Sequence, residues 1–149
     1  MERMTDRPAA AGAVAAYLSL LSFHVAHILE EILGRFVVLH KLGPVLFAAA
    51  NWVLFCLPVV LFYFWLDGRR WARRMSILYA GVMVLNGLGH NVMTLATGRY
   101  LDGYAGGYSG IGLALSGALL LRLLLRESGR PGRPRASDAL PEENAPGRM

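Results

Sequence analysis

Long apolar blocks separated by short polar stretches dominate the chain. Four blocks, at residues 13–33, 44–66, 71–97 and 107–125, approach or exceed the roughly 20 residues that an α-helix needs to cross a hydrocarbon core of about 30 Å. This pattern predicts an all-α, polytopic membrane protein with four transmembrane helices in one bundle. Composition agrees, since 55% of the residues are hydrophobic and 17% are charged, more apolar than an average soluble domain.

The two ends of the chain differ from these blocks. We expect residues 1–12 to form a cytoplasmic N-terminal segment and residues 13–126 to form the transmembrane domain. Residues 127–149 are rich in Pro, Gly, Arg and Glu, so they are predicted to be a disordered cytoplasmic tail. The first block continues to Leu33 without a small-residue cleavage site, which argues against a cleaved signal peptide.

The basic residues are distributed unevenly between the two predicted sides of the membrane. One side would carry Arg3, Arg7, Arg69, Arg70, Arg73, Arg74, Arg126, Arg130, Arg133, Arg135 and Arg148, and the other Arg35, Lys41 and Arg99. Because Lys and Arg accumulate in cytoplasmic loops, both termini are predicted to be cytoplasmic. The net charge of +5 is then an orientation signal, and no nucleic-acid partner is expected. The preference for Arg over Lys suggests a bacterial protein with a GC-rich genome, and hence the bacterial inner membrane.

Histidines and glutamates gather inside the first apolar block. An ionisable side chain in the hydrocarbon layer costs about 2.5 to 3.5 kcal/mol on insertion scales, so it usually faces the bundle interior and has a partner. At about 100° per residue, His24, His27 and Glu31 share one face of the predicted helix, and Glu30 flanks it. This polar face indicates a site inside the bundle.

The third block carries a second polar row, in which Asn86 and His90 share a face. At 1.5 Å per residue, these residues lie roughly 10 to 16 Å from the non-cytoplasmic end of their helix, at a depth similar to that of His24 and Glu31. Asn51 reaches the same layer from the second block, and Tyr104 and Tyr108 approach it from the start of the fourth. A single buried site near the non-cytoplasmic side is therefore predicted.

Two short motifs carry a resemblance to a known family. H-I-L-E-E at residues 27–31, followed by N-G-L-G-H at residues 86–90, resembles the HXXEE family of small bacterial membrane proteins. The resemblance covers residues 17–111. It implies membrane embedding but no particular reaction. The family's Y-x-P-G turn would correspond to residues 104–107, where this chain has glycine in place of proline.

The residue types favour a divalent metal site. Imidazole nitrogens and carboxylate oxygens suit zinc, iron or manganese, and such a metal could polarise a lipid-like or hydrophobic substrate. The candidate ligands are His24, His27, Glu31 and His90. The candidate catalytic residues are Glu30, Glu31 and Tyr108, and the candidate supporting or substrate-contacting residues are Asn51, Asn86 and Tyr104.

Two other functions fit the same residues. Without a metal, a buried carboxylate pair can hold one proton and act as acid and base, for example in an isomerase or cyclase for an isoprenoid-like substrate. The cluster could also be a structural polar network or part of a path for ions or protons. The expected partners are the lipid bilayer and a hydrophobic small molecule or lipid. Gly112 and Ser116 have a spacing that could support a homo-oligomer.

Overall fold

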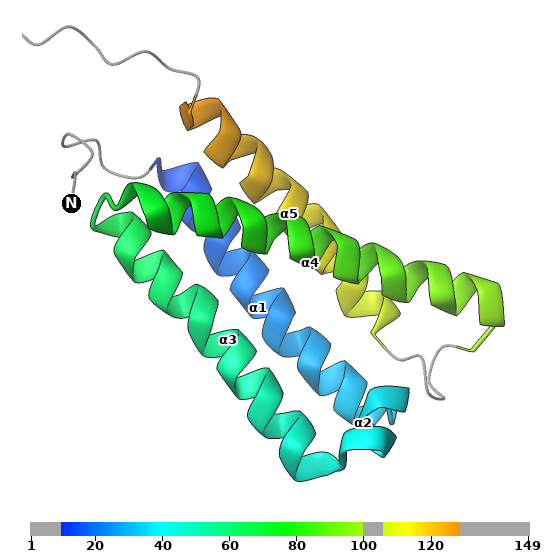
Figure 1. The fold of residues 1–149 in the computed structure, drawn as a ribbon. Coiled ribbons are helices and arrows are strands. Elements are labelled where there is room, and N and C mark those ends of the chain that lie inside the picture. Colours follow the sequence, from blue (N-terminus) through cyan, green and yellow to red (C-terminus); the bar gives the residue numbers. More distant parts are fainter. Residues whose placement is uncertain (1–9, 100–105, 129–149) are drawn as a thin grey trace, which may run out of the picture.

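The computed structural model describes residues 10–99 and 106–128, and this part of the chain is helical (Figure 1). Its helices are α1 (Ala11–Leu33), α2 (Val37–Leu42), α3 (Pro44–Leu66), α4 (Arg70–Thr97) and α5 (Gly107–Ser128). The all-α prediction is confirmed. The predictions for residues 1–9, for Tyr104 and for most of the C-terminal tail fall outside the described residues.

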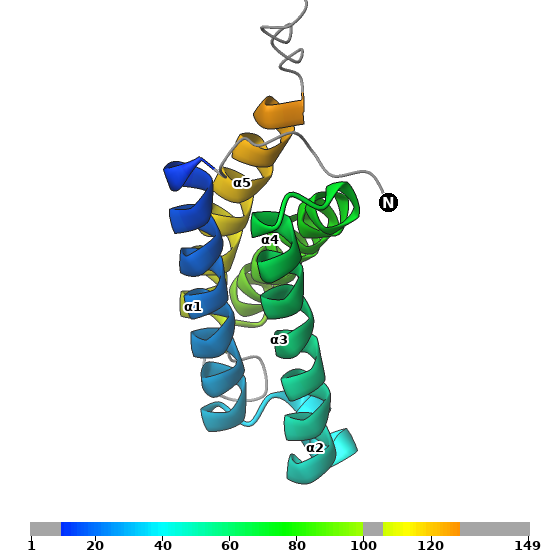
Figure 2. The same ribbon diagram turned by 90° about the vertical axis from the view of Figure 1, so that its left-hand side faces the viewer.

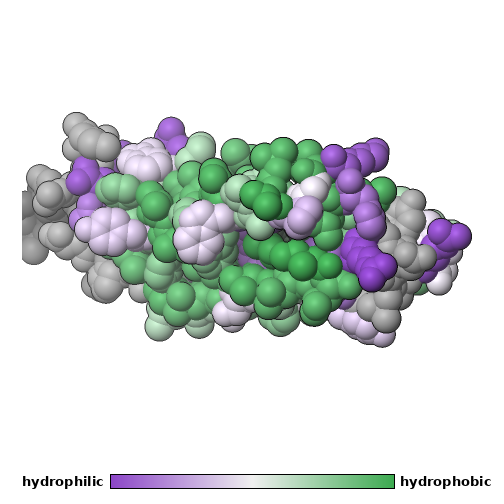
Figure 3. All heavy atoms as spheres, turned by 90° about the horizontal axis from the view of Figure 1, so that it is seen from below, coloured by the Kyte–Doolittle hydropathy of each residue, from purple (hydrophilic) through white to green (hydrophobic). Residues whose placement is uncertain are grey.

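Three helices are long and apolar enough to cross a membrane: α1, α3 and residues 107–126 of α5. Figure 3 shows a mostly hydrophobic surface along the middle of the bundle, with hydrophilic residues gathered toward its ends. These features are those of a multi-pass membrane protein. Although α4 has 28 residues, it is less apolar because it begins with arginines and carries Asn86, His90 and Asn91. The fourth span and the cytoplasmic termini therefore stay predictions.

The long helices alternate in direction, and α1 lies between α3 and α5 (Figures 1 and 2). The start of α1, the junction of α3 with α4 and the end of α5 lie at one end of the bundle, with α2 at the other. α4 crosses the other three helices at a clear angle. α4 packs closely along α5, and it meets α1 through side chains that include Tyr79, Asn86 and His90.

The segment between α1 and α3 contains a short helix that was not predicted. α2 has six residues, ends at Leu42 and is followed by Gly43, which has a φ of 75°. Glycine populates positive φ at little cost, and proline is favoured in the first turn of a helix, so Gly43 and Pro44 separate α2 from α3. His40 lies exposed on α2.

Glycines allow α4 and α5 to approach closely. A Cβ atom added to Gly87 would lie 2.2 Å from the carbonyl oxygen of Gly110 and 3.0 Å from the amide nitrogen of Ala114. Small residues permit such backbone contacts between membrane helices. The fully buried leucines of α5 continue the contact into the core: Leu113, Leu120 and Leu124. α1, α4 and α5 therefore form the well-packed part of the molecule.

Candidate metal centre

Three buried side chains from two helices converge on one point. His27 and Glu31 lie one turn apart on α1, and His90 comes from α4; one potential ligand atom of each lies within 4.8 Å of the other two. Oε1 of Glu31 is 3.5 Å from Nε2 of His27 and 3.3 Å from Nε2 of His90. The polar faces predicted for α1 and α4 do meet.

These separations match the size of a metal coordination shell. With metal–ligand bonds of 2.0 to 2.2 Å in a tetrahedral site, neighbouring ligand atoms are about 3.4 Å apart. The two contacts of Glu31 are close to this length, and the ligand atoms of His27 and His90 lie within 4.8 Å of each other. Two nitrogens and one oxygen are also a ligand set that zinc, iron and manganese accept. The triad of His27, Glu31 and His90 could therefore hold a divalent ion.

Ser109 at the start of α5 fixes the orientation of His27. The Oγ of Ser109 lies 2.9 Å from Nδ1 of His27, and it donates a short hydrogen bond to Oε2 of Glu30. A hydroxyl has one proton, so once Ser109 donates to the carboxylate it can only accept from His27. Nδ1 of His27 then carries the proton, and Nε2 presents its lone pair.

With the proton on Nδ1, Nε2 of His27 accepts a hydrogen bond from the side-chain amide of Asn86 on α4, whose Nδ2 lies 3.1 Å away. Oε1 of Glu31 lies 3.5 Å from the same Nε2. A metal ion held by the triad would take the place of the Asn86 donor at Nε2.

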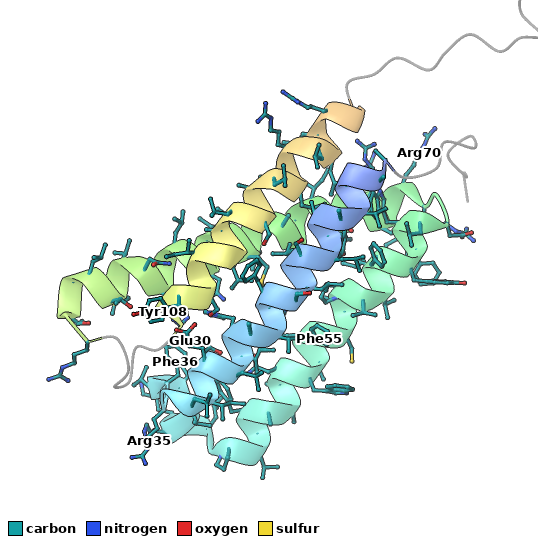
Figure 4. The ribbon with its side chains drawn as sticks, turned by 180° about the vertical axis from the view of Figure 1, so that it is seen from behind. Glu30, Arg35, Phe36, Phe55, Arg70 and Tyr108 are labelled. Atoms are coloured by element: carbon teal, nitrogen blue, oxygen red, sulfur yellow. The ribbon has the colours of Figure 1, made fainter. Side chains whose placement is uncertain are left out.

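Glu30 was predicted to be catalytic, but its carboxylate contacts the first turn of α5. It accepts hydrogen bonds from the backbone N–H groups of Tyr108, at 3.3 Å, and Ser109, at 2.8 Å, in addition to the Ser109 hydroxyl. Figure 4 shows Glu30 beside Tyr108 at the start of α5. A carboxylate is favoured there because the first N–H groups of a helix lack intrahelical partners and carry partial positive charge.

Gly106 leaves the space in which the two histidines pack. A Cβ atom there would lie 2.6 Å from Nδ1 of His90 and 2.7 Å from Cε1 of His27, and its φ is 119°. The rings of His27 and His90 are perpendicular, with centroids 4.5 Å apart, and Phe36 contacts His90 from the other side. Gly106 is also the position of the proline in the Y-x-P-G turn, and proline cannot adopt this φ.

His24, expected among the ligands, is not part of the converging group and contacts another residue. Its Nδ1 is 3.1 Å from the hydroxyl of Tyr79 on α4. The group of converging ligand atoms found among the described residues comprises His27, Glu31 and His90. His24 and Tyr79 form a second polar pair on the same side of α1.

A cavity of about 820 Å³ adjoins both polar groups. It is lined by residues of α1, α2, α3 and α4, most of them apolar. Its polar lining residues are His24, His27, Glu31, Asn51, Tyr79 and Asn86. The metal triad therefore borders the cavity through His27 and Glu31.

The remaining predicted residues lie at the edge of the site or beyond the described part of the chain. Asn51 lines the cavity and donates to the carbonyl of Phe47. The side chain of Tyr108 is on the surface, with 72% of the residue exposed. Sequence reasoning missed Ser109 and Tyr79. Tyr79 precedes Asn86 by seven residues and so shares its helix face, a signal that was available.

No family model, curated protein or solved structure with which the chain was compared matches it.

Proposed function

We propose that this chain is a membrane-embedded metalloprotein that acts on a lipid-like substrate. A divalent zinc, iron or manganese ion would be held by His27, Glu31 and His90. The observation that carries this proposal is the convergence of His27, Glu31 and His90, three buried side chains whose potential ligand atoms lie within 4.8 Å of one another. A metal in such a site supplies Lewis-acid chemistry.

The surroundings of the triad support a reactive centre over a purely structural one. The ligands are buried, which strengthens electrostatic interactions, and the apolar cavity of about 820 Å³ reaches two of them. Ligand pockets are typically concave, mostly apolar and equipped with a few convergent polar groups. Asn86 and Tyr79 could orient a polar substrate group beside the metal.

We also propose a membrane topology and a family for this chain. In a four-span arrangement α4 would be the third transmembrane helix, and both termini would be cytoplasmic in a bacterial inner membrane. His27 lies six residues before the end of α1, roughly 9 Å along the helix axis, which is consistent with a centre in the non-cytoplasmic half. The two motifs at residues 27–31 and 86–90 favour membership of the HXXEE family.

Elemental analysis of protein purified in detergent tests the metal directly. We expect about one equivalent of one transition metal in the wild type, and its loss from Glu31→Gln and His90→Gln, because each removes a ligand of the triad. His40→Gln is the matched control, since His40 is exposed on α2; it should keep the metal. Metal-free wild-type protein, folded and purified without chelators, would refute the proposal.

A second function would follow from that negative result. If a proton occupies the space between His27 and Glu31, then the Glu31 carboxyl group becomes the donor and His27 the acceptor. Such a pair can transfer protons to and from a substrate in the cavity. The isomerase or cyclase alternative is therefore favoured by the same contact, and the metal content distinguishes it from the first proposal.

A further inference from the structure

The cavity is long and has two chemically different ends. Its lining on α4 extends from Trp71 to Asn86, fifteen residues, or about 22 Å along the helix axis. The Asn86 end borders His27 and Glu31 of the triad. The opposite end, near Trp71, is formed by apolar side chains, among them Leu61 and Met75. A polar group can thus be satisfied at one end and a hydrocarbon chain at the other.

The cavity is open on the side where α3 and α4 lie apart. Leu57 of α3 and Leu78 and Val82 of α4 line it, yet they are 57%, 60% and 47% exposed. Leucine and valine with so much exposed surface suit contact with lipid chains. An entering molecule would therefore pass between α3 and α4 directly from the hydrocarbon layer.

The volume limits the occupant. A cavity of about 820 Å³ is within the usual range for one small molecule, and its length exceeds what a compact ligand would need. An extended chain with one polar group fits this shape, whereas a lipid with two full chains would extend beyond it.

We propose that the cavity binds a single-chain amphiphile drawn laterally from the bilayer. Its oxygen-bearing head group lies at the metal centre beside Asn86, and its hydrocarbon chain extends along α4 toward Trp71. This assignment rests on the proposed metal centre for the head group, and on the cavity's shape and lining for the chain.

Photocrosslinking tests the position of the chain. The full-length, metal-loaded protein in phosphatidylcholine vesicles is irradiated with hexadecanoic acid that carries a diazirine on its terminal carbon, and labelled residues are mapped by mass spectrometry. We expect labelling around Trp71 and Met75 to exceed that of the exposed α5 residues Ile111 and Leu115 about tenfold, a preference equivalent to burying two methylene groups. Equal labelling of both surfaces would overturn the proposal.

A matched pair of variants tests the route of entry. Leu78→Trp fills the opening, whereas Leu85→Trp adds the same bulk on α4 at a residue that is 71% exposed and is not among those that line the cavity. Labelling near Trp71 should fall about tenfold in the first variant, since the chain loses buried surface, and stay unchanged in the second. Equal labelling in both variants would overturn the proposal.

The role of the head group is tested separately from the metal itself. Metal content is measured on the same vesicles. If the protein contains the metal but is labelled uniformly, the proposed amphiphile binding is refuted and the proposed metal site is not. In Glu31→Gln, which removes a metal ligand, labelling near Trp71 should fall severalfold because the head group loses its anchor. Unchanged labelling in a metal-free Glu31→Gln protein would overturn the head-group assignment.

Discussion

The two sides of α1 are packed in opposite ways. Toward α5, a Cβ atom added to Gly112 would lie 2.1 Å from the ring of Phe23, and the α5 leucines facing the core are fully buried. Toward α3, direct contacts such as the hydrogen bond from Tyr17 to the carbonyl of Pro58 are fewer, and a cavity lies beside them. α3 buries few residues: Phe47, Pro58, Leu61 and Trp65. The ligands of the metal centre and the residue that orients His27 come from α1, α4 and α5. The closely packed helices α1, α4 and α5, called the frame below, thus carry the candidate ligands and their supporting residue. The less closely packed α3 borders the cavity.

Metal affinity should be most sensitive to substitution of Gly106, where the backbone lies against His27 and His90. Gly106→Ala places a methyl group against His27 and His90 and also strains a backbone with a φ of 119°. We expect the metal affinity to fall on the order of 100-fold, since strain and displaced ligands together cost a few kcal/mol. Competition with a fluorescent chelator measures this affinity.

Gly98→Ala is the control for Gly106→Ala. Gly98 has a φ of 62°, so alanine is strained there too, but a Cβ atom at this position meets nothing within 4 Å. Metal affinity should be unchanged in this variant. A similar loss in both variants would mean that backbone strain, and not contact with the histidines, is responsible.

The crossing of α4 and α5 should be the next most sensitive point. In Gly87→Ala the new methyl group meets the backbone of Gly110 and Ala114, which cannot rotate away as a side chain would. We expect a loss of about 2 kcal/mol in the free energy of unfolding, typical of overpacking. Denaturation in mixed micelles, followed by circular dichroism, measures it.

Gly89→Ala tests whether this loss reflects packing. Gly89 lies on the same helix, and a Cβ atom there meets nothing within 4 Å. Alanine is a better helix former than glycine by up to about 1 kcal/mol, so this variant should be equally or more stable than the wild type. Destabilisation by both Gly87→Ala and Gly89→Ala would contradict the close packing of α4 against α5.

The hydrogen bond from His27 to Ser109 should have an intermediate effect. Ser109→Ala leaves all three ligands in place but removes the group that holds the His27 tautomer, and the loss of such a supporting partner typically lowers metal affinity 10- to 100-fold. We expect about tenfold. Ser116→Ala is matched, since Ser116 is also buried on α5 and bonds its own helix at Gly112. Equal affinities in the two variants would remove Ser109 from the site.

A substitution at His24 distinguishes the triad of His27, Glu31 and His90 from the second polar pair, His24 and Tyr79. Because Nδ1 of His24 contacts Tyr79, His24→Phe should change the metal affinity by less than about threefold, as expected for a site outside the coordination shell. Titration with zinc by calorimetry checks this. Complete loss of the metal would instead make His24 the fourth ligand that the sequence suggested.

The sequence predicted the parts of the site that depend on helix periodicity. The spacing of His27 and Glu31 placed them on one face, and helix rise put His90 at the same depth, because both quantities are fixed by α-helical geometry. It could not predict that Glu30 would turn to α5, since this depends on how two helices dock. Gly106 was equally inaccessible, because its role comes from a backbone angle outside a helix. The low hydropathy of α4 has the same origin as the site, since that helix supplies Asn86 and His90.

The contact between Glu30 and the first turn of α5 has a consequence for the order of assembly. Glu30 and His27 are synthesised early, His90 follows on α4, and Ser109 arrives only with the last helix. Until α5 docks, Glu30 lacks the N–H groups that it accepts from, and His27 lacks the hydroxyl that sets its tautomer. Before α5 is synthesised, the three candidate ligands are therefore present on α1 and α4, but the His27 ring is not yet held by Ser109. If the triad binds a metal, tight binding should then come late in biogenesis, after α5 has docked.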